Sequence, residues 1–495
     1  MISSIARARW TALGSRWFTE EALAPMLLLV GLGALVCLTP AQNDTWWHLR
    51  SGREMWETGS LLTTERFSHT AFGADLRNYW WISQLAFFAL YAMGGPVLLT
   101  LAAGACAYAA VFGSWRLMRG SWEVRLVLLI FLILATAPEW AVRPQVISLA
   151  LLVLTAHALT RDRVGWLPLL FVVWANAHPQ VVLGVALTGA AALEALVWSR
   201  TRVKRDMWTA VCCAAAPMAS PDGWRFWLEA IQTVSVSRAV QLQEYRPPID
   251  AGSLPFWIAV GVLAVMVFLK RGSIANWDRA DRVLTIAAVL LAAASVGAAR
   301  NIAFFAVIAA PALSRILSSR NAVPARASAP AGVGAYVMVA VAVVAAAVAV
   351  RVGWQDGGVR LGWRPLSDSI VNAVRLCPGR MFNHLADGGY LMWALPSRPV
   401  FVDSRMNAYP VALLQRSRDA DLNGVYSDLF RQYGIGCAVV STESPLRQRL
   451  AGDPSMTPVY ADAAHAVFQR AGVMASMTAS GGERDLWFDP DLEVP

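Results

Sequence analysis

Long apolar stretches alternate with short polar ones over the first 350 residues. A helix needs about 20 apolar residues to cross a hydrocarbon core of about 30 Å, and most of these stretches approach that length. The pattern therefore predicts an α-helical polytopic membrane protein with about 11 transmembrane helices. The expected spans are residues 22–40, 84–115, 124–138, 144–160, 166–176, 180–198, 207–219, 254–269, 283–298, 302–317 and 333–350.

Two stretches depart from a simple span. The second one is long and is interrupted by Gly94-Gly95-Pro96, which indicates a short half-helix followed by a full span. Residues 223–236 are amphipathic but too polar to cross the membrane. We expect this segment to lie in the membrane interface.

The segment 41–83, which follows the first span, is polar but rich in tryptophan. Tryptophan gathers where a chain leaves the bilayer, so we expect a large first external loop at the membrane surface. Asn43-Asp44 opens a short helical pattern with Trp46, Leu49 and Trp56 on one face. A helix lying flat on the membrane would place Asp44 at its start, just outside the lipid.

The composition changes near residue 351, where apolar runs shorten and charges return. Residues 1–350 therefore form the expected transmembrane domain, and 351–495 a small external α/β domain. Strands are expected at 398–403 and 434–441, with a hairpin over 458–470. Helical spacing covers 367–376 and 412–433.

Charge sets the expected orientation. The chain of 495 residues is 57% hydrophobic and 15% charged, and its net charge of +9 comes from arginines in short loops between spans rather than from a nucleic-acid surface. Alternate loops are richer in basic residues, which predicts a cytoplasmic N-terminus and an external tail. In a bacterium this means the inner membrane, with the tail in the periplasm. The first span lacks a small-residue cleavage site and should remain as an anchor.

Two of the six cysteines, Cys377 and Cys437, lie in the tail, and a disulfide between them is possible if that side is oxidising. The other four cysteines fall in apolar runs and are expected to be small core residues.

With this topology, polar residues near the ends of several spans fall on the outer side. Ionisable groups at membrane depth usually line a cavity or a path. Because five separate loops deliver them to one face, we expect a shared outward-facing cavity. Its residues are Asp44, His48, Glu139, Arg143, Asn176, His178, Asp222, Glu244, Arg246 and Arg300, with Asp403 and Arg405 of the tail as further candidates.

These residue types suit transfer of a group from a lipid phosphate. Asp44 can act as general base on an acceptor hydroxyl, with His48 and Glu139 as further catalytic candidates. Arg143, His178 and Arg300 can neutralise the phosphate of a lipid donor, because each stands without an obvious structural partner. The sequence has neither a Gly-rich phosphate loop nor the Cys/His spacing of a zinc site.

The sequence resembles the GT-C glycosyltransferases, including a set of bacterial membrane proteins of that superfamily. The resemblance lies in DTWWHLRSGREMWETGSL with WWISQ downstream, in RPQ at 143–145, in NAHPQ at 176–180, and in FNHLADGGYLMWAL and RPVFVDSR within 382–405. It implies a polyprenyl-phosphate sugar donor, with Asp44 as the first-loop catalytic acid. The acidic pair common in that superfamily is missing, since Thr45 follows Asp44. A divalent metal is therefore possible but not supported by that motif. The acceptor, whether glycan, lipid or protein, is not specified.

Each candidate also has a plainer interpretation. Asp44 can be the N-cap of its helix, and His48 a helix-surface residue. Arg143 can extend to the headgroups. Glu244 with Arg246, and Asp403 with Arg405, can be local ion pairs. As alternatives to a transferase, a flippase or transporter would more typically show repeats, which the sequence lacks, and an envelope scaffold would not need Asp44 beside the membrane.

Overall fold

The computed structural model describes residues 20–239, 243–318 and 333–471. By contacts, the chain falls into two compact units. Of the described residues, the helical unit contains those up to Pro40 and those within Pro96–Ala219 and Glu244–Leu361. The mixed unit contains those within Ala41–Gly95 and Ser220–Gln243 and those from Gly362 onward. The predicted boundary after residue 350 divides the chain into two consecutive parts, whereas each of these units contains several segments of the chain. That boundary stays a prediction.

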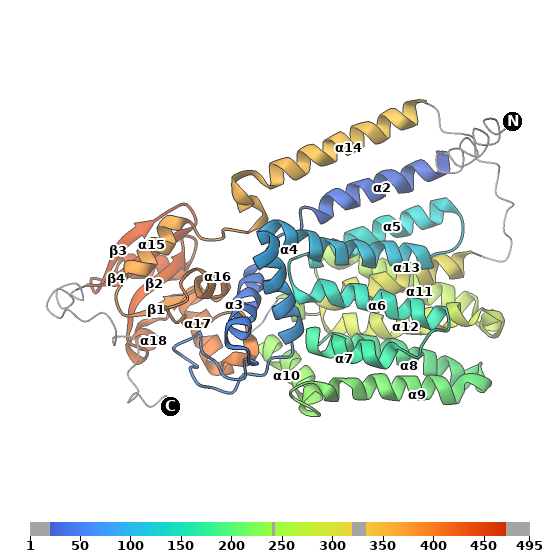
Figure 1. The fold of residues 1–495 in the computed structure, drawn as a ribbon, viewed down its shortest axis with the longest axis horizontal. Coiled ribbons are helices and arrows are strands. Elements are labelled where there is room, and N and C mark those ends of the chain that lie inside the picture. Colours follow the sequence, from blue (N-terminus) through green and yellow to red (C-terminus); the bar gives the residue numbers. More distant parts are fainter. Residues whose placement is uncertain (1–19, 240–242, 319–332, 472–495) are drawn as a thin grey trace. The chain divides into compact units, whose positions relative to one another are not determined.

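Each of the expected spans falls on a helix. These helices are α2 (Glu20–Val36), α4 (Trp81–Leu117), α5 (Trp122–Thr136), α6 (Pro144–Thr160), α7 (Leu167–Ala177), α8 (Val181–Val197), α9 (Val203–Ala215), α11 (Leu254–Leu269), α12 (Arg279–Gly297), α13 (Ile302–Leu317) and α14 (Val333–Gly353) (Figure 1). Among the described residues, five helical stretches are long and apolar enough to cross a membrane: Trp81–Leu117, Ala251–Leu269, Arg279–Gly297, Ala299–Leu317 and Tyr336–Gly353. The number of crossings stays a prediction.

Helix α13 forms the centre of the helical unit. Its side chains from Ala303 to Ser314 are all buried, and it packs against α5, α6, α11 and α12. At the other extreme, α14 packs along α2 (Figure 1) but exposes large aliphatic side chains such as Val341 and Val344. In a bilayer such a face contacts lipid, so its exposure costs little there.

The interruption expected in the second apolar stretch is present. Helix α4 is broken at Gly94 and Gly95, and Gly95 has a φ of 60°. A residue with a side chain rarely adopts that conformation, and Pro96 cannot donate a helical hydrogen bond. The three residues therefore end one helix and start another.

A four-stranded sheet forms the base of the mixed unit, with strand order β1-β2-β4-β3. Its strands are β1 (Arg380–Asn383), β2 (Ile435–Ser441), β3 (Met456–Ala461) and β4 (His465–Arg470). β1 and β2 are parallel, while β2–β4 and β3–β4 are antiparallel. The expected strand at 434–441 and the hairpin over 458–470 are confirmed, whereas β1 was not predicted.

The strand expected at 398–403 is wrong. Only Val400 forms a bridge, with Ser68 of the first loop. The Asn383 side chain takes the backbone groups that a ladder would need, because it accepts from the Phe401 N–H (2.8 Å) and donates to the Val402 carbonyl (2.8 Å). The segment is therefore a loop held by a side chain.

Short helices complete the mixed unit: α3 (Asn43–Thr58), α10 (Arg225–Ala239), α15 (Asp368–Leu376), α16 (Leu385–Ala394), α17 (Val411–Asn423), α18 (Ser427–Gln432) and α19 (Pro445–Ala451). The helix expected at 412–433 is divided in two, because Gly424 adopts a left-handed conformation and ends α17. α10 covers the amphipathic segment 223–236. The loop after α3 joins the tail, since Val400 exchanges backbone hydrogen bonds with Phe67 (2.9 Å) and His69 (3.0 Å).

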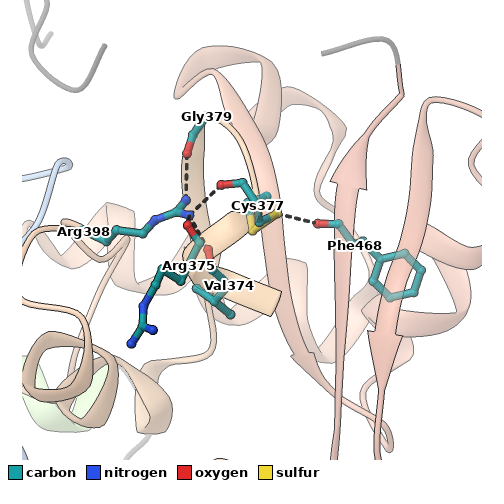
Figure 2. The surroundings of a disulfide bond; sticks show 7 residues. Val374, Arg375, Cys377, Gly379, Arg398 and Phe468 are labelled. Atoms are coloured by element: carbon teal, nitrogen blue, oxygen red, sulfur yellow. Dashed lines mark hydrogen bonds between the residues drawn. A yellow bond between two sulfur atoms is a disulfide. The ribbon is translucent and has the colours of Figure 1, made fainter. Parts of the chain in front are cut away.

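A disulfide joins Cys377 to Cys437, which confirms that pairing (Figure 2). It ties the end of α15 to β2. Beside it, Arg398 donates to the backbone carbonyls of Val374, Cys377 (2.5 Å) and Gly379 (3.0 Å). Burial lowers the pKa of Arg398 to about 10. Together the disulfide and this arginine close the C-terminal end of α15, where carbonyls lack helical partners.

Candidate functional site

Asp44 lies in the first turn of α3, but it is not the helix cap. The N-cap is Gln42, whose backbone N–H donates to Thr45 Oγ1 at 2.9 Å. The helix begins at Asn43 because Gln42 still has extended backbone angles. The capping interpretation of Asp44 is therefore wrong, and its carboxylate is used elsewhere.

Two donors hold the same oxygen of Asp44. The Ser404 hydroxyl donates to Asp44 Oδ1 at 2.5 Å, and the Trp47 indole N–H donates to it at 3.2 Å. Trp47 Nε1 also lies 3.1 Å from Ser404 Oγ, so the three groups form a closed triangle. Sequence reasoning missed Ser404, although it lies between the two tail candidates Asp403 and Arg405.

His48 is buried one turn after Asp44, and its described surroundings are aromatic. Its ring centroid lies 3.5 Å from that of Trp47, and 6.1 and 6.2 Å from those of Trp80 and Phe87, which pack edge to face. The interpretation of His48 as a surface residue is wrong.

Asp403 and Arg405 form a buried ion pair, as the plainer interpretation expected. Both are almost fully buried, and Arg405 contacts both oxygens of Asp403 (2.8 and 2.6 Å) and Glu65 Oε2 (2.7 Å). Burial lowers the pKa of the Arg405 guanidinium, but the charges of Asp403 and Glu65 outweigh this and hold the pKa well above its usual value. Glu65, from the first loop, was not predicted.

Tyr409 and two backbone groups complete this network. The Tyr409 hydroxyl donates to Asp403 Oδ2 at 2.5 Å, and the N–H groups of Phe67 and Ser68 donate to Glu65 Oε1 at 2.8 Å each. We call Glu65, Asp403, Arg405 and Tyr409 the Arg405 network. Its ionic groups are paired and hydrogen-bonded, which a buried charge requires.

Asp222 belongs to the mixed unit, whereas Glu244 and Arg246 of the same expected loop belong to the helical unit. Burial raises its pKa; the charge of Arg77 opposes this, and that of Glu229 adds to it. Arg77 pairs with Glu229, which also accepts from the Tyr79 hydroxyl at 3.3 Å. The charges of Arg77 and Glu229 therefore act on Asp222, and neither residue was predicted from the sequence.

In the helical unit, Arg143 and Arg300 converge on one carboxylate. Glu244, in the short helix η4 (Gln243–Tyr245), has Oε1 3.1 Å from Arg300 and Oε2 3.7 Å from Arg143. The expectation that both arginines stand without partners is wrong. The local pair of Glu244 with Arg246 stays a prediction. Short segments between helices bring together residues that lie far apart in sequence.

Gln145 and Tyr245 extend this group, which we call the Arg300 cluster. Arg300 donates to Gln145 Oε1 at 2.9 Å and to the Tyr245 hydroxyl, and its guanidinium lies 4.6 Å from the centre of the Tyr245 ring. Gln145 donates in turn to Glu139, which lies in η1 (Ala137–Glu139). Burial raises the pKa of Glu139 although Arg300 and Arg143 act against it.

The guanidinium groups of Arg143 and Arg300 both face the carboxylate of Glu244. The Glu244 side chain is 33% exposed, whereas those of Arg143 and Arg300 are 18% and 12% exposed. An anion could therefore share the arginines with Glu244 or displace it.

His178 and Asn176 lie at the end of α7. His178 Nδ1 is 2.9 Å from the Ser148 hydroxyl, which also accepts from the Trp174 indole at 2.8 Å. The Gln180 N–H points at the same nitrogen (3.4 Å), so Nδ1 is an acceptor and Nε2 carries the proton. The Asn176 side chain donates to the Val172 carbonyl. Of the remaining predicted residues, Arg246 accepts at its backbone carbonyl from the Ala299 N–H at 3.0 Å.

Within the described ranges, no group of three or more His, Cys, Asp or Glu side chains is placed to hold a metal ion.

The structure divides the predicted residues between two groups. Asp44 and His48 lie in the mixed unit with the Arg405 network, and Glu139, Arg143, Glu244 and Arg300 form the Arg300 cluster of the helical unit.

No protein-family model matches the sequence, and no curated protein matches it. Solved structures do match the fold. The oligosaccharyltransferase AglB from Archaeoglobus fulgidus, in complex with an inhibitory peptide and a dolichol-phosphate, aligns with a TM-score of 0.54 at 11% identity, over 84% of this chain and 69% of that one. The Archaeoglobus fulgidus oligosaccharyltransferase tethered to an acceptor peptide aligns with a TM-score of 0.51 at 11% identity, over 86% and 70%.

A structure of ArnT from Cupriavidus metallidurans bound to undecaprenyl phosphate aligns over 94% of this chain and 98% of that one, with a TM-score of 0.49 at 15% identity. The two alignments with TM-scores above 0.5 extend over more than four fifths of this chain. The resemblance drawn from the motifs is therefore confirmed at the level of fold, and the chain is similar in fold to the GT-C membrane glycosyltransferases.

Proposed function

We propose that this protein is an integral-membrane glycosyltransferase that transfers a sugar from a polyprenyl-phosphate donor to an acceptor of the bacterial cell envelope. The observation that carries the proposal is the Asp44 carboxylate, which two neutral donors hold at the start of α3 in a protein with this fold. The AglB structure contains a dolichol-phosphate, and we extend a polyprenyl-phosphate donor to this chain.

Asp44 is the general base in this proposal. In the transfer, the acceptor oxygen bonds to the sugar carbon while the bond from that carbon to the phosphate oxygen breaks, and polyprenyl phosphate leaves. The acceptor hydroxyl loses its proton in this step, and a carboxylate within hydrogen-bond reach can take it. Trp47, His48 and Trp80 surround the start of α3 with aromatic rings. Such rings exclude water from a reacting group and offer flat faces to a sugar.

The Arg300 cluster binds the phosphate of the donor. Arg143 and Arg300 supply two positive charges, and arginine binds phosphate oxygens through charge-assisted hydrogen bonds. His178 presents Nε2–H as a further donor. The lipid tail needs an apolar surface, which the exposed aliphatic side chains of the helical unit provide.

The reaction takes place on the periplasmic side of the inner membrane, with the N-terminus in the cytoplasm. The Cys377–Cys437 disulfide supports this orientation, because structural disulfides persist in oxidising compartments such as the periplasm. The arginine-rich loops between spans give the same orientation.

The test is an Asp44→Asn variant expressed in cells that lack the native gene. Asparagine keeps the shape of the side chain but cannot take a proton at neutral pH, so transfer should fall by about 100-fold or more in an envelope glycan profile. The purified variant should still bind undecaprenyl phosphate in nanodiscs, because the Arg300 cluster is unchanged. Full transfer by a well-expressed, folded variant would end the catalytic role of Asp44.

A further inference from the structure

Two adjacent glycines in α16 bring the start of α3 and the 402–404 loop onto one helix. A Cβ at Gly388 would lie 2.1 Å from the Val402 carbonyl oxygen, and one at Gly389 would lie 2.6 Å from the Asn43 carbonyl oxygen. Both approaches are closer than real Cβ contacts allow. Only glycine lets α16 touch both backbones, so the pair sets where Asp44 and Ser404 meet.

The residues on both sides of Ser404 are fixed inside the protein. Asp403 is 0% exposed and Arg405 is 3% exposed, and both belong to the Arg405 network. The Arg405 backbone N–H also donates to Asp403 Oδ1 at 2.9 Å, which folds the chain tightly around Ser404. Ser404 itself is only partly buried. Its hydroxyl donates to Asp44 Oδ1, which is not part of the Arg405 network.

We propose that Ser404 is a positioning residue for Asp44, and this rests on the proposed role of Asp44 as base. Its hydroxyl donates to Asp44 Oδ1 and so fixes the orientation of the carboxylate. The Arg405 network holds Ser404 at the required place, as supporting residues do for a functional group. Because Ser404 and Trp47 are neutral donors, they orient the carboxylate without adding a charge.

The first test does not depend on any sugar donor. Dicyclohexylcarbodiimide, an apolar reagent, modifies protonated carboxyl groups, and mass spectrometry of peptides from the full-length protein measures its rate at Asp44. The Ser404 hydroxyl occupies Asp44 Oδ1, so Ser404→Ala frees that oxygen for the reagent. Labelling at Asp44 should rise by about tenfold, the equivalent of one hydrogen bond to a charged group.

The matched control is Ser441→Ala, at the end of β2, which should leave Asp44 labelling unchanged. Ser404→Thr retains a hydroxyl and should keep labelling low. If Ser404→Ala does not fold, Ser404→Cys fills the same space with a weak donor and should give the same increase. An unchanged labelling rate at Asp44 in the folded Ser404 variants would overturn the proposal.

The second test is a double-mutant cycle on transfer, read from the envelope glycan profile. Ser404→Ala should lower transfer by about tenfold in the native background and by nothing further in Asp44→Asn. An equal loss in both backgrounds would show that Ser404 acts independently of Asp44 and reject the proposal. If Asp44→Asn itself leaves transfer intact, the proposed function fails, while the labelling result still decides whether Ser404 holds Asp44.

Discussion

Replacing Arg405 by methionine should strongly destabilise the mixed unit. Methionine fills similar space but leaves the carboxylates of Glu65 and Asp403, both 0% exposed, without their cation. Removing one partner of a buried ion pair typically costs about 3–5 kcal/mol, because the remaining charge stays desolvated. The other donors to these carboxylates, from Tyr409 and the Phe67 and Ser68 backbone, remain but carry no charge.

Thermal unfolding in detergent, followed by tryptophan fluorescence, measures this loss. For a unit of this size about 3–5 kcal/mol corresponds to roughly 6–20 °C in apparent Tm. The control is Arg431→Met, which breaks an ion pair with Asp428 whose side chains are 77% and 84% exposed, and which should cost at most about 1 kcal/mol.

A triple variant separates lost charge from lost packing. Glu65→Gln and Asp403→Asn, added to Arg405→Met, remove the uncompensated carboxylates and should recover part of the stability. Replacing a whole buried ionic group is often far less harmful than removing one partner. If Arg405→Met unfolds at the same temperature as Arg431→Met, the conclusion that the Arg405 network stabilises the mixed unit is refuted.

Three further predictions follow from the sequence and the structure. A cysteine placed at exposed Glu443 should react with an impermeant maleimide in intact spheroplasts, whereas one at Ser273 should not. Reduction of the Cys377–Cys437 disulfide, which spans 60 residues, should lower stability by about 4 kcal/mol, while reductant should not affect a Cys377→Ser variant. Because the folded pKa of Glu139 is raised above 4.5, wild-type stability should fall as pH rises from 4.5 through that raised pKa, and Glu139→Gln should remove this part of the pH profile in parallel melts.

The helices could be predicted from the pattern of apolar residues because that pattern is local in the sequence. Each apolar stretch carries its own length and composition, and Gly94-Gly95-Pro96 carries its own reason to break a helix. The sheet was less accessible: β1 has only four residues, and the Val- and Phe-rich segment at 398–403 has the composition of a strand. Whether such a segment joins a ladder depends on partners elsewhere in the chain, here Asn383 and Ser68, which composition does not reveal.

The site residues show the same division. Asp44 stood out because an acid beside Trp46 and Trp47 at a membrane boundary is unusual by itself. Ser404 and Glu65 did not, since a serine and a glutamate in polar loops are ordinary until their partners are known. Arg143 and Arg300 were selected as isolated charges, and their shared partner Glu244 lies 56 residues from Arg300.

The pair Gly388-Gly389 connects these observations. In the sequence it lowers the helical propensity of a short helix, which alone would be a cost of about 1 kcal/mol for each glycine. In the structure it permits two backbone contacts, at 2.1 and 2.6 Å from an added Cβ, that place Ser404 against Asp44 across 360 positions of sequence. The close backbone contacts explain why two residues of low helical propensity stand in this helix. The glycines, the buried Arg405 network and the Ser404 hydroxyl therefore act on one target, the orientation of the Asp44 carboxylate.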